Sequence, residues 1–149
     1  LLESTAFGAR TIIEQIRSSG VAVDEIVVCG GIAEKNPLLL QIFADVLGMP
    51  LSLSSSDQTC ALGAAIFGSV AAGAEAGGYD SVEKAQQAMT AIKDGSCQPG
   101  SEGEKAYDKL YSLYRQLHDA FGGVNRAADL GGIMKELSLL RDRAGQDPA

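Results

Sequence analysis

A short apolar run that stops at a pair of glycines constrains the fold of this chain more than any other feature. Residues 25–29 (EIVVC) are continuously apolar after the first position and rich in β-branched side chains, and they end at Gly30-Gly31. Such a run predicts a strand buried on both faces of a sheet. Asn36 followed by Pro37 then predicts the N-cap and the first residue of a helix. The sequence therefore predicts a strand, a glycine turn and a helix in direct succession.

Patterns on either side of this unit indicate an α/β layering. The helical spacing of apolar residues predicts a helix over 3–19 that Gly20 ends in a left-handed cap. Residues 50–53 (PLSL) predict a second short strand. The uncharged stretch 58–74 predicts a buried helix, capped by Asp57 or a neighbouring serine. Two short strands are thus expected among several helices.

The composition becomes more polar after these elements, and three further helices are predicted. The first is expected to be capped by Asp80, with Glu83 three residues on as in a capping box. Residues 95–103 have the composition of a surface loop, and a long amphipathic helix is expected from about 102 to 121. The expected organisation is an α/β core over 1–78 and a helical tail over 79–149.

Charge and cysteine content exclude several classes of function. The 149 residues include 12 Lys and Arg against 19 Asp and Glu, a formal net charge of −7. No basic run is present, so nucleic acid is not an expected partner. The stretch 58–74 is mostly Ala, Gly and Ser, so no membrane span is expected. Three cysteines without a CxxC pair and a single His118 argue against a metal site or a disulfide scaffold, and they suit a reducing, cytoplasmic compartment.

The glycine pair and the helix start behind it are the best candidate for a ligand site. Gly30 and Gly31 follow the predicted strand at its carboxyl end, where ligands bind in α/β sheets. Glycines at this point let the backbone approach a flat ligand, and the amide of Asn36 can cap its helix and still reach a ribose or adenine. A tight turn without a ligand explains the pair equally well. Neither a Walker A loop nor a GxGxxG motif is present.

Other reactive or aromatic residues are better explained by packing. The small residues of Cys60–Ala65 suit close contact with a sheet or a neighbouring helix. His118 beside Asp119 has no recognisable nucleophile to activate, and Cys29 at a strand end is typically an inert small hydrophobe. A stripe of tyrosines lacks the basic groove that would accompany a stacking platform for nucleic acid. These tyrosines are Tyr107, Tyr111 and Tyr114.

Three segments occur in a specific order and spacing. They are 28–37 (VCGGIAEKNP), 41–50 (QIFADVLGMP) and 61–65 (ALGAA). Together they resemble the C-terminal domain of the FGGY carbohydrate kinases, with its strand, glycine pair, "AD-x-x-G-x-P" signature and "LGAA" helix. Residues 2–7 are similar to the preceding helix of that family, and 110–122 are similar to the tail of its L-ribulokinases. The resemblance covers nearly the whole chain, more loosely after Gly78.

The resemblance implies a fragment of an actin-like ATPase fold, in which two RNase H-like domains close over ATP and a sugar. By family analogy Gly31 and Asn36, with Gly30 beside them, line the adenosine pocket. The whole enzyme would transfer the γ-phosphoryl group of ATP to a terminal hydroxyl of a pentulose, most of all L-ribulose, with Mg²⁺ neutralising the phosphates. The phosphate loops and the Asp that acts as base would lie upstream, so no catalytic residue is assigned and this chain alone is expected to be inactive.

The expected partners are therefore ATP and a sugar, both bound together with an N-terminal domain. An exposed strand edge also makes a homo-oligomer an expectation. Three alternatives stay open. They are an FGGY kinase for xylulose, ribulose, ribitol or glycerol; an actin-like ATPase activator of radical dehydratases, although Cys29, Cys60 and Cys97 lack the clustering that an iron–sulfur site needs; and a non-catalytic module that docks through its tyrosine-rich helix.

Overall fold

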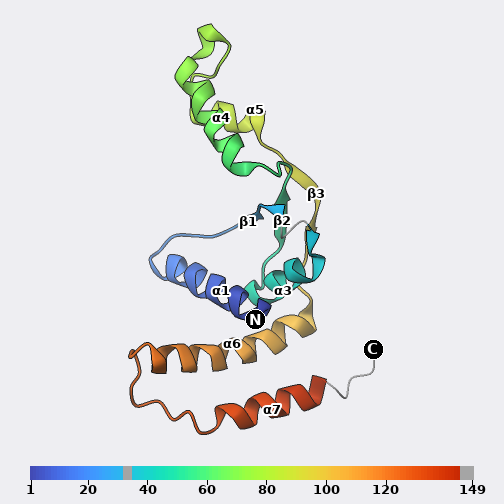
Figure 1. Ribbon diagram of the computed structural model, residues 1–149, viewed down its shortest axis with the longest axis vertical. Coiled ribbons are helices and arrows are strands. Elements are labelled where there is room, and N and C mark those ends of the chain that lie inside the picture. The colour runs from blue at the N-terminus through green and yellow to red at the C-terminus, as the bar shows by residue number, and fades with distance from the viewer. Residues whose placement is uncertain (32–34, 145–149) are drawn as a thin grey trace.

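The computed structural model describes residues 1–31 and 35–144 and confirms the α/β class (Figure 1). A small sheet lies at the centre, α1 and α3 lie against one end of it with α6 and α7 beyond them, and α4 and α5 project from the other end. The elements are α1 (Leu2–Ser18), β1 (Ile26–Val28), α3 (Pro37–Leu47), β2 (Leu51–Ser54), α4 (Thr59–Ala72), η1 (Ala74–Ala76), α5 (Val82–Met89), β3 (Ile92–Cys97), α6 (Ser101–Phe121) and α7 (Ile133–Ala144).

The sheet has the order β1-β2-β3. β1 and β2 run parallel, with Ile26 opposite Leu51 and Val28 opposite Leu53, and α3 makes the crossover between them. β3 pairs antiparallel with β2 and places Cys97 opposite Leu51. This third strand was not predicted, and residues 95–97, assigned to a surface loop, belong to it. The polar sequence of β3 (IKDGSC) shows no alternation, so only its tertiary pairing with β2 makes it a strand. The other elements described in the expected tail, α5, α6 and α7, are helices.

The prediction that β1 is buried on both faces is wrong for the described chain. Val27 is 47% exposed and Cys29 is also exposed. β1 is an edge strand of the sheet, and the described residues cover the side chain of Val27 only in part.

The helix after the glycine pair begins and ends as its sequence predicts. Asn36 is the N-cap of α3, and its Oδ1 accepts a hydrogen bond from the Leu39 N–H at 3.1 Å. Pro37 occupies the first turn, where its missing N–H costs nothing. Gly48 ends the helix in the left-handed conformation, at φ 60°. Gly20 likewise has a positive φ directly after the cap of α1.

Two predicted caps are wrong. Ser81, not Asp80, is the N-cap of α5, and its hydroxyl accepts from the Lys84 N–H at 3.3 Å. Asp80 instead pairs with the Lys84 ammonium at 3.0 Å. α4 has no side-chain cap, because its N-cap position is taken by Gln58 and not by Asp57 or a serine.

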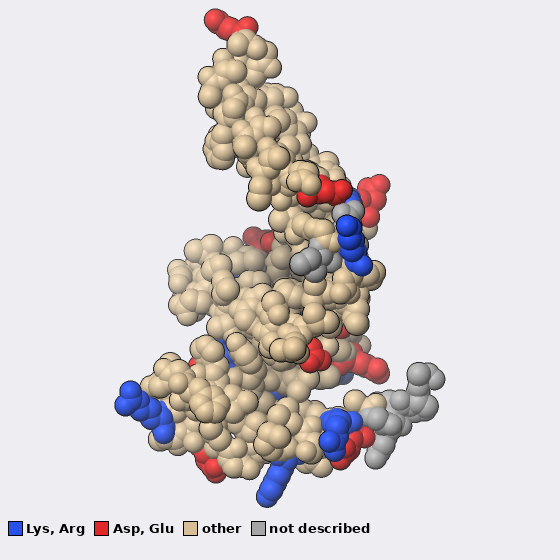
Figure 2. All heavy atoms as spheres, viewed as in Figure 1, with Lys and Arg blue, Asp and Glu red and all other residues tan. Residues whose placement is uncertain are grey.

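The expectation of a buried helix over 58–74 is also wrong for the described chain. Of α4, only Ile66 is buried, and Phe67 is 66% exposed. α4 packs chiefly on α5, and the two project from the sheet as an arm whose visible surface is almost free of charge (Figure 2). None of the described helices combines the length and the apolar character that crossing a membrane requires.

The hydrophobic core lies where α1, α3 and α6 meet. The Phe7 ring lies 5.4 Å from the Tyr114 ring and 5.9 Å from the Tyr111 ring, measured between centroids. Ile42 and Val46 of α3 complete this cluster. The tyrosine stripe of α6 therefore packs against the core, as the sequence analysis favoured.

Candidate functional site

The glycine pair lies directly beyond the carboxyl end of β1. Gly30 has φ +99°, a conformation that other residues rarely adopt, so glycine is required there. Gly31 has no positive φ, and a Cβ added to it would meet no described atom within 4 Å. Among the described residues nothing covers the backbone of Gly31 on this side, as close approach of a flat ligand would require.

Asn36 keeps one half of its amide free. Its Oδ1 is engaged by the Leu39 N–H, whereas its Nδ2 donates no hydrogen bond within the described part of the chain. An amide group has two donor hydrogens on its nitrogen. Asn36 can therefore cap α3 and donate to a ligand at the same time.

A hollow of about 380 Å³ lies beside the end of β1. Cys29 lines it from the position directly after β1, and Leu62 and Gly63 line it from the small-residue stretch of α4. Gly30, Gly31 and Asn36 are not among its lining residues, although Gly30 follows Cys29 in the chain. The structure thus brings the strand end and the "LGAA" helix to one hollow. It does not bring the three predicted site residues into it.

Among the described residues that line this hollow there is no carboxylate, ammonium or guanidinium group. Its lining is mostly apolar, with hydroxyl groups from Ser54, Thr59 and Thr90. Such an environment suits a flat, uncharged group such as a nucleobase better than a phosphate. The part played by α4 was missed because its small residues were interpreted as packing. The signal was that this helix follows the second parallel strand, whose carboxyl end lies beside that of the first.

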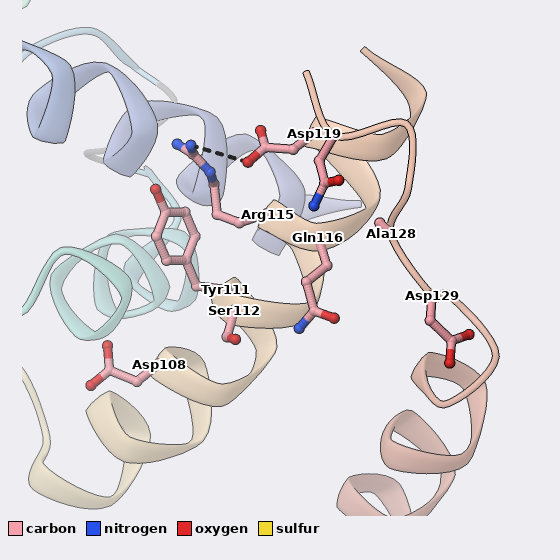
Figure 3. A pocket seen from close by; sticks show the side chains of 9 residues that line it. Asp108, Tyr111, Ser112, Arg115, Gln116, Asp119, Ala128 and Asp129 are labelled. Atoms are coloured by element: carbon pink, nitrogen blue, oxygen red, sulfur yellow. Dashed lines mark ion pairs between the residues drawn. The ribbon is translucent and has the colours of Figure 1, made fainter. Parts of the chain in front are cut away.

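A larger hollow, of about 500 Å³, lies between α6 and the connection to α7 (Figure 3). Arg115 and Asp119 line it and form an ion pair at 3.5 Å. A hydrogen bond from His118, together with Arg115, lowers the pKa of Asp119. His118 itself is exposed on the surface of α6, as the sequence analysis favoured. None of the predicted site residues lies in this hollow.

The cysteines do not form a site. Cys29 and Cys60 are exposed, and the Cys97 thiol donates to Gln41 Oε1 at 3.2 Å. Burial raises the pKa of the Cys97 thiol. Within residues 1–31 and 35–144, no group of three His, Cys, Asp or Glu side chains could hold a metal ion.

The fold matches that of a known sugar kinase. The crystal structure of xylulose kinase from Rhodospirillum rubrum superimposes with a TM-score of 0.65 over 83% of this chain and 24% of that chain, at 23% sequence identity. This likeness supports the assignment of the chain as a piece of the actin-like fold.

Sequence comparison identifies the family. Residues 1–72 match the C-terminal domain of the FGGY family of carbohydrate kinases. Ribulokinase from Halalkalibacterium halodurans is 49% identical over 142 residues, which are 95% of this chain and 24% of that protein. Ribulokinase from Mycolicibacterium smegmatis is 45% identical over 144 residues, 97% of this chain and 24% of that protein. The chain spans about a quarter of the length of these curated relatives. It therefore contains a C-terminal domain of the FGGY family of carbohydrate kinases.

Proposed function

We propose that this chain is the nucleotide-binding C-terminal part of an ATP-dependent kinase that phosphorylates a terminal hydroxyl of a pentulose. The observation that carries the proposal is the backbone of Gly31, which is open among the described residues. Gly31 lies three residues past the end of β1 and two residues past Cys29, which lines a hollow without charged groups in its described lining. Adenine would enter the hollow beside Cys29 and Gly63, and the free Nδ2 of Asn36 would donate to the adenosine.

The contribution of this chain to the reaction is orientation. Holding adenosine at a fixed angle to the sugar lowers the entropic part of the barrier, by up to several kcal/mol in well-positioned systems. On this proposal Mg²⁺ binds together with the phosphates of ATP and neutralises their charge. No Asp of this chain is assigned as the base that accepts the proton of the sugar hydroxyl. The catalytic base and the sugar site belong, on this proposal, to an N-terminal domain.

The proposed substrate is L-ribulose, with L-ribulose 5-phosphate as the product. Its support is the identity of 45–49% to several relatives that are named ribulokinases. The alternative of a docking module has less support, because the central ring of the tyrosine stripe, Tyr111, is only 6% exposed and is packed in the core.

ADP release by the full-length protein tests the proposal, measured with Mg-ATP and L-ribulose, D-ribulose, D-xylulose, ribitol or glycerol. We expect strong stimulation by L-ribulose. ATP hydrolysis that no sugar stimulates would support an ATPase activator instead, and a protein that neither binds nor turns over nucleotide would support an interaction module.

A variant of Gly31 tests the location of the site. Gly31→Val places a side chain in the open space at the end of β1, so we expect the KM for ATP to rise by about tenfold or more, because the side chain occupies the ligand's position. Gly68→Ala on α4 is the control, since a Cβ there also meets nothing within 4 Å. An unchanged ATP dependence in Gly31→Val would rule out this position.

A further inference from the structure

The long tail helix α6 begins without a side-chain cap of its own, and a carboxylate from another helix binds the backbone N–H of its N-cap residue. The N-cap residue of α6 is Gly100, which has no side chain to offer. Asp45 of α3 lies at this helix end, and its Oδ1 accepts from the Gly100 N–H at 2.7 Å. Asp45 is 9% exposed. A carboxylate at a helix N-terminus satisfies an unpaired N–H group and interacts favourably with the helix dipole.

The first turn of α6 is shaped around this carboxylate. A Cβ added to Gly103 would lie 2.4 Å from Asp45 Oδ2 and 2.8 Å from Asp45 Cγ, closer than real atoms approach. Glycine is a poor helix former, so its presence in the first turn calls for a reason. Gly103 leaves the space that the Asp45 side chain occupies.

Gln41, one turn before Asp45 on α3, binds the same region between β3 and α6. Its Nε2 donates to Asp45 Oδ1 at 2.8 Å and to the Gln98 carbonyl at 2.9 Å. Its Oε1 accepts from the Cys97 thiol at 3.2 Å. Two side chains of α3 therefore bind three residues between the end of β3 and the start of α6, namely Cys97, Gln98 and Gly100. We call Gln41 and Asp45 the α3 clamp.

The clamp and the proposed adenosine site share one short helix. α3 lies between the sheet and α6, and its N-cap is Asn36 (Figure 1). Asn36 and Gln41 are five residues apart, about 8 Å along a helix axis. Asp45 is nine residues from Asn36, about two and a half helical turns, so both clamp residues lie within three turns of the Asn36 amide.

We propose that Gln41 and Asp45 are positioning residues that fix the start of α3, and with it Asn36, by locking α3 to the tail helix α6. The inference rests on the proposed function for its ligand, but the clamp itself rests on the contacts above. The tail thus acts on nucleotide binding without touching the nucleotide.

The test uses the full-length kinase that carries this chain, with Asp45→Ala, Asp45→Asn, Gln41→Ala and the control Ser101→Ala. Ser101 lies at the same helix end, with its side chain exposed. Hydrogen exchange measured at residues 97–104 and 36–41 reports local opening. For Asp45→Ala we expect roughly tenfold faster exchange at both segments, the size of a lost helix cap. Asp45→Asn keeps an oxygen for the Gly100 N–H and should restore most of the protection.

Steady-state kinetics separate positioning from general damage. For Asp45→Ala and Gln41→Ala we expect the KM for ATP to rise by about three- to tenfold, with kcat and the KM for sugar changed less than about twofold. Changes of equal size in the KM for ATP, in kcat and in the KM for sugar would overturn the positioning role. Ser101→Ala should leave all of them unchanged.

A pair of substitutions tests the geometry directly. Gly103→Ala should speed exchange at 97–104 in the wild-type background, because its methyl group meets Asp45. When the same substitution is added to Asp45→Ala, the exchange rate at 97–104 should stay the same or fall. The conflicting atoms are then gone, and alanine favours helix. Equal effects in the two backgrounds would overturn the clamp. If Asp45→Ala does not fold, Asp45→Asn and Gly103→Ala carry the test.

The outcomes distinguish this inference from the proposed function. If Gly31→Val raises the KM for ATP and the clamp variants do not, the site stands and the positioning role fails. If the protein shows no ATP-dependent activity, the proposed function fails, and the positioning role fails with it. The exchange data at 97–104 then still decide whether the clamp exists.

Discussion

Arg10 of α1 donates to Asp108 of α6 at 2.6 Å across 98 positions of sequence. The same Nη1 donates to the Val46 carbonyl on α3 at 3.0 Å, and the guanidinium lies 4.3 Å from the centroid of the Tyr111 ring. One side chain therefore joins the three helices that form the core. A carboxylate such as that of Asp108 could not join the helices in this way, because it only accepts hydrogen bonds and the Val46 carbonyl needs a donor.

Replacing Arg10 should destabilise the core markedly. We expect Arg10→Met to lower the free energy of unfolding by about 2 kcal/mol, because the Val46 carbonyl and Asp108 lose their donor. Arg10→Lys keeps the charge but not the planar fork, so its loss should be smaller. The control Lys84→Ala removes an exposed pair with Asp80 and should cost less than about 0.5 kcal/mol. Urea denaturation of each variant measures this, and equal costs for Arg10→Met and Lys84→Ala would contradict the role of Arg10.

The buried hydroxyl of Tyr111 should make the protein sensitive to alkaline pH. Burial and a 2.6 Å hydrogen bond to Glu14 raise the pKa of Tyr111 above the ordinary 10.0. A raised pKa means that the folded state holds the proton more tightly. The resulting stability is complete below the unfolded value and is lost as pH rises through the folded value.

Tyr111→Phe tests this directly. The variant should lose about 1 kcal/mol at neutral pH with the hydrogen bond to Glu14. Its further loss of stability between about pH 9 and pH 12 should be smaller than in the wild type. Urea midpoints over this range provide the measurement. Parallel pH profiles for the two proteins would show that Tyr111 does not titrate in this way.

Asn36 allows its two roles to be separated. Asn36→Ala should destabilise by about 1 kcal/mol through loss of the α3 cap. Asn36→Asp keeps an oxygen for the Leu39 N–H but has no Nδ2 donor, so stability should be preserved while the KM for ATP rises. Calorimetric titration with ATP, combined with thermal denaturation, distinguishes the two. Unchanged ATP affinity in Asn36→Asp would leave Asn36 as a cap only.

The two glycines should respond differently to alanine. Gly30→Ala forces a methyl-bearing residue into φ +99° and should cost about 1–2 kcal/mol of stability. Gly31→Ala has neither a positive φ nor a described neighbour within 4 Å, so its stability should change little. Thermal denaturation of the pair measures the difference. Similar losses of stability for the two variants would show that Gly31 is constrained by something other than its φ angle and its described neighbours.

Cysteine labelling should map the hollow beside β1. Cys29 is exposed and lines it, so bound ATP in the full-length protein should slow alkylation of Cys29. Cys97 should react slowest of the three, because its thiol is engaged by Gln41 and burial raises its pKa. Mass spectrometry of labelled peptides gives the rates with and without nucleotide. Labelling of Cys29 that ATP does not affect would exclude the hollow as the nucleotide site.

Local chemistry made part of this structure predictable. Asn36, Pro37 and Gly48 determine where α3 starts and stops, and each acts through backbone groups within one turn. Gly30 likewise has the left-handed conformation that only a glycine adopts readily. These features need no knowledge of the rest of the fold.

Features that depend on distant partners escaped prediction. β3 is a strand because β2 lies beside it, and its own residues favour a loop. Leu62 and Gly63 line the hollow because α4 follows the strand that pairs in parallel with β1, and this relationship depends on the pairing of the two strands. The composition of α4 predicts a buried helix, although its surface is exposed. Apolar composition indicates a preference for burial and not the presence of a packing partner.

The family match ends at residue 72, but the sheet does not. β2 acquires its antiparallel neighbour from residues 92–97, and the core around Phe7 is completed by rings of α6. A protein cut at residue 72 would leave β2 with a bare hydrogen-bonding edge and Phe7 without its aromatic neighbours. The segment that matches the family model is therefore shorter than the segment whose strands and helices pack together here.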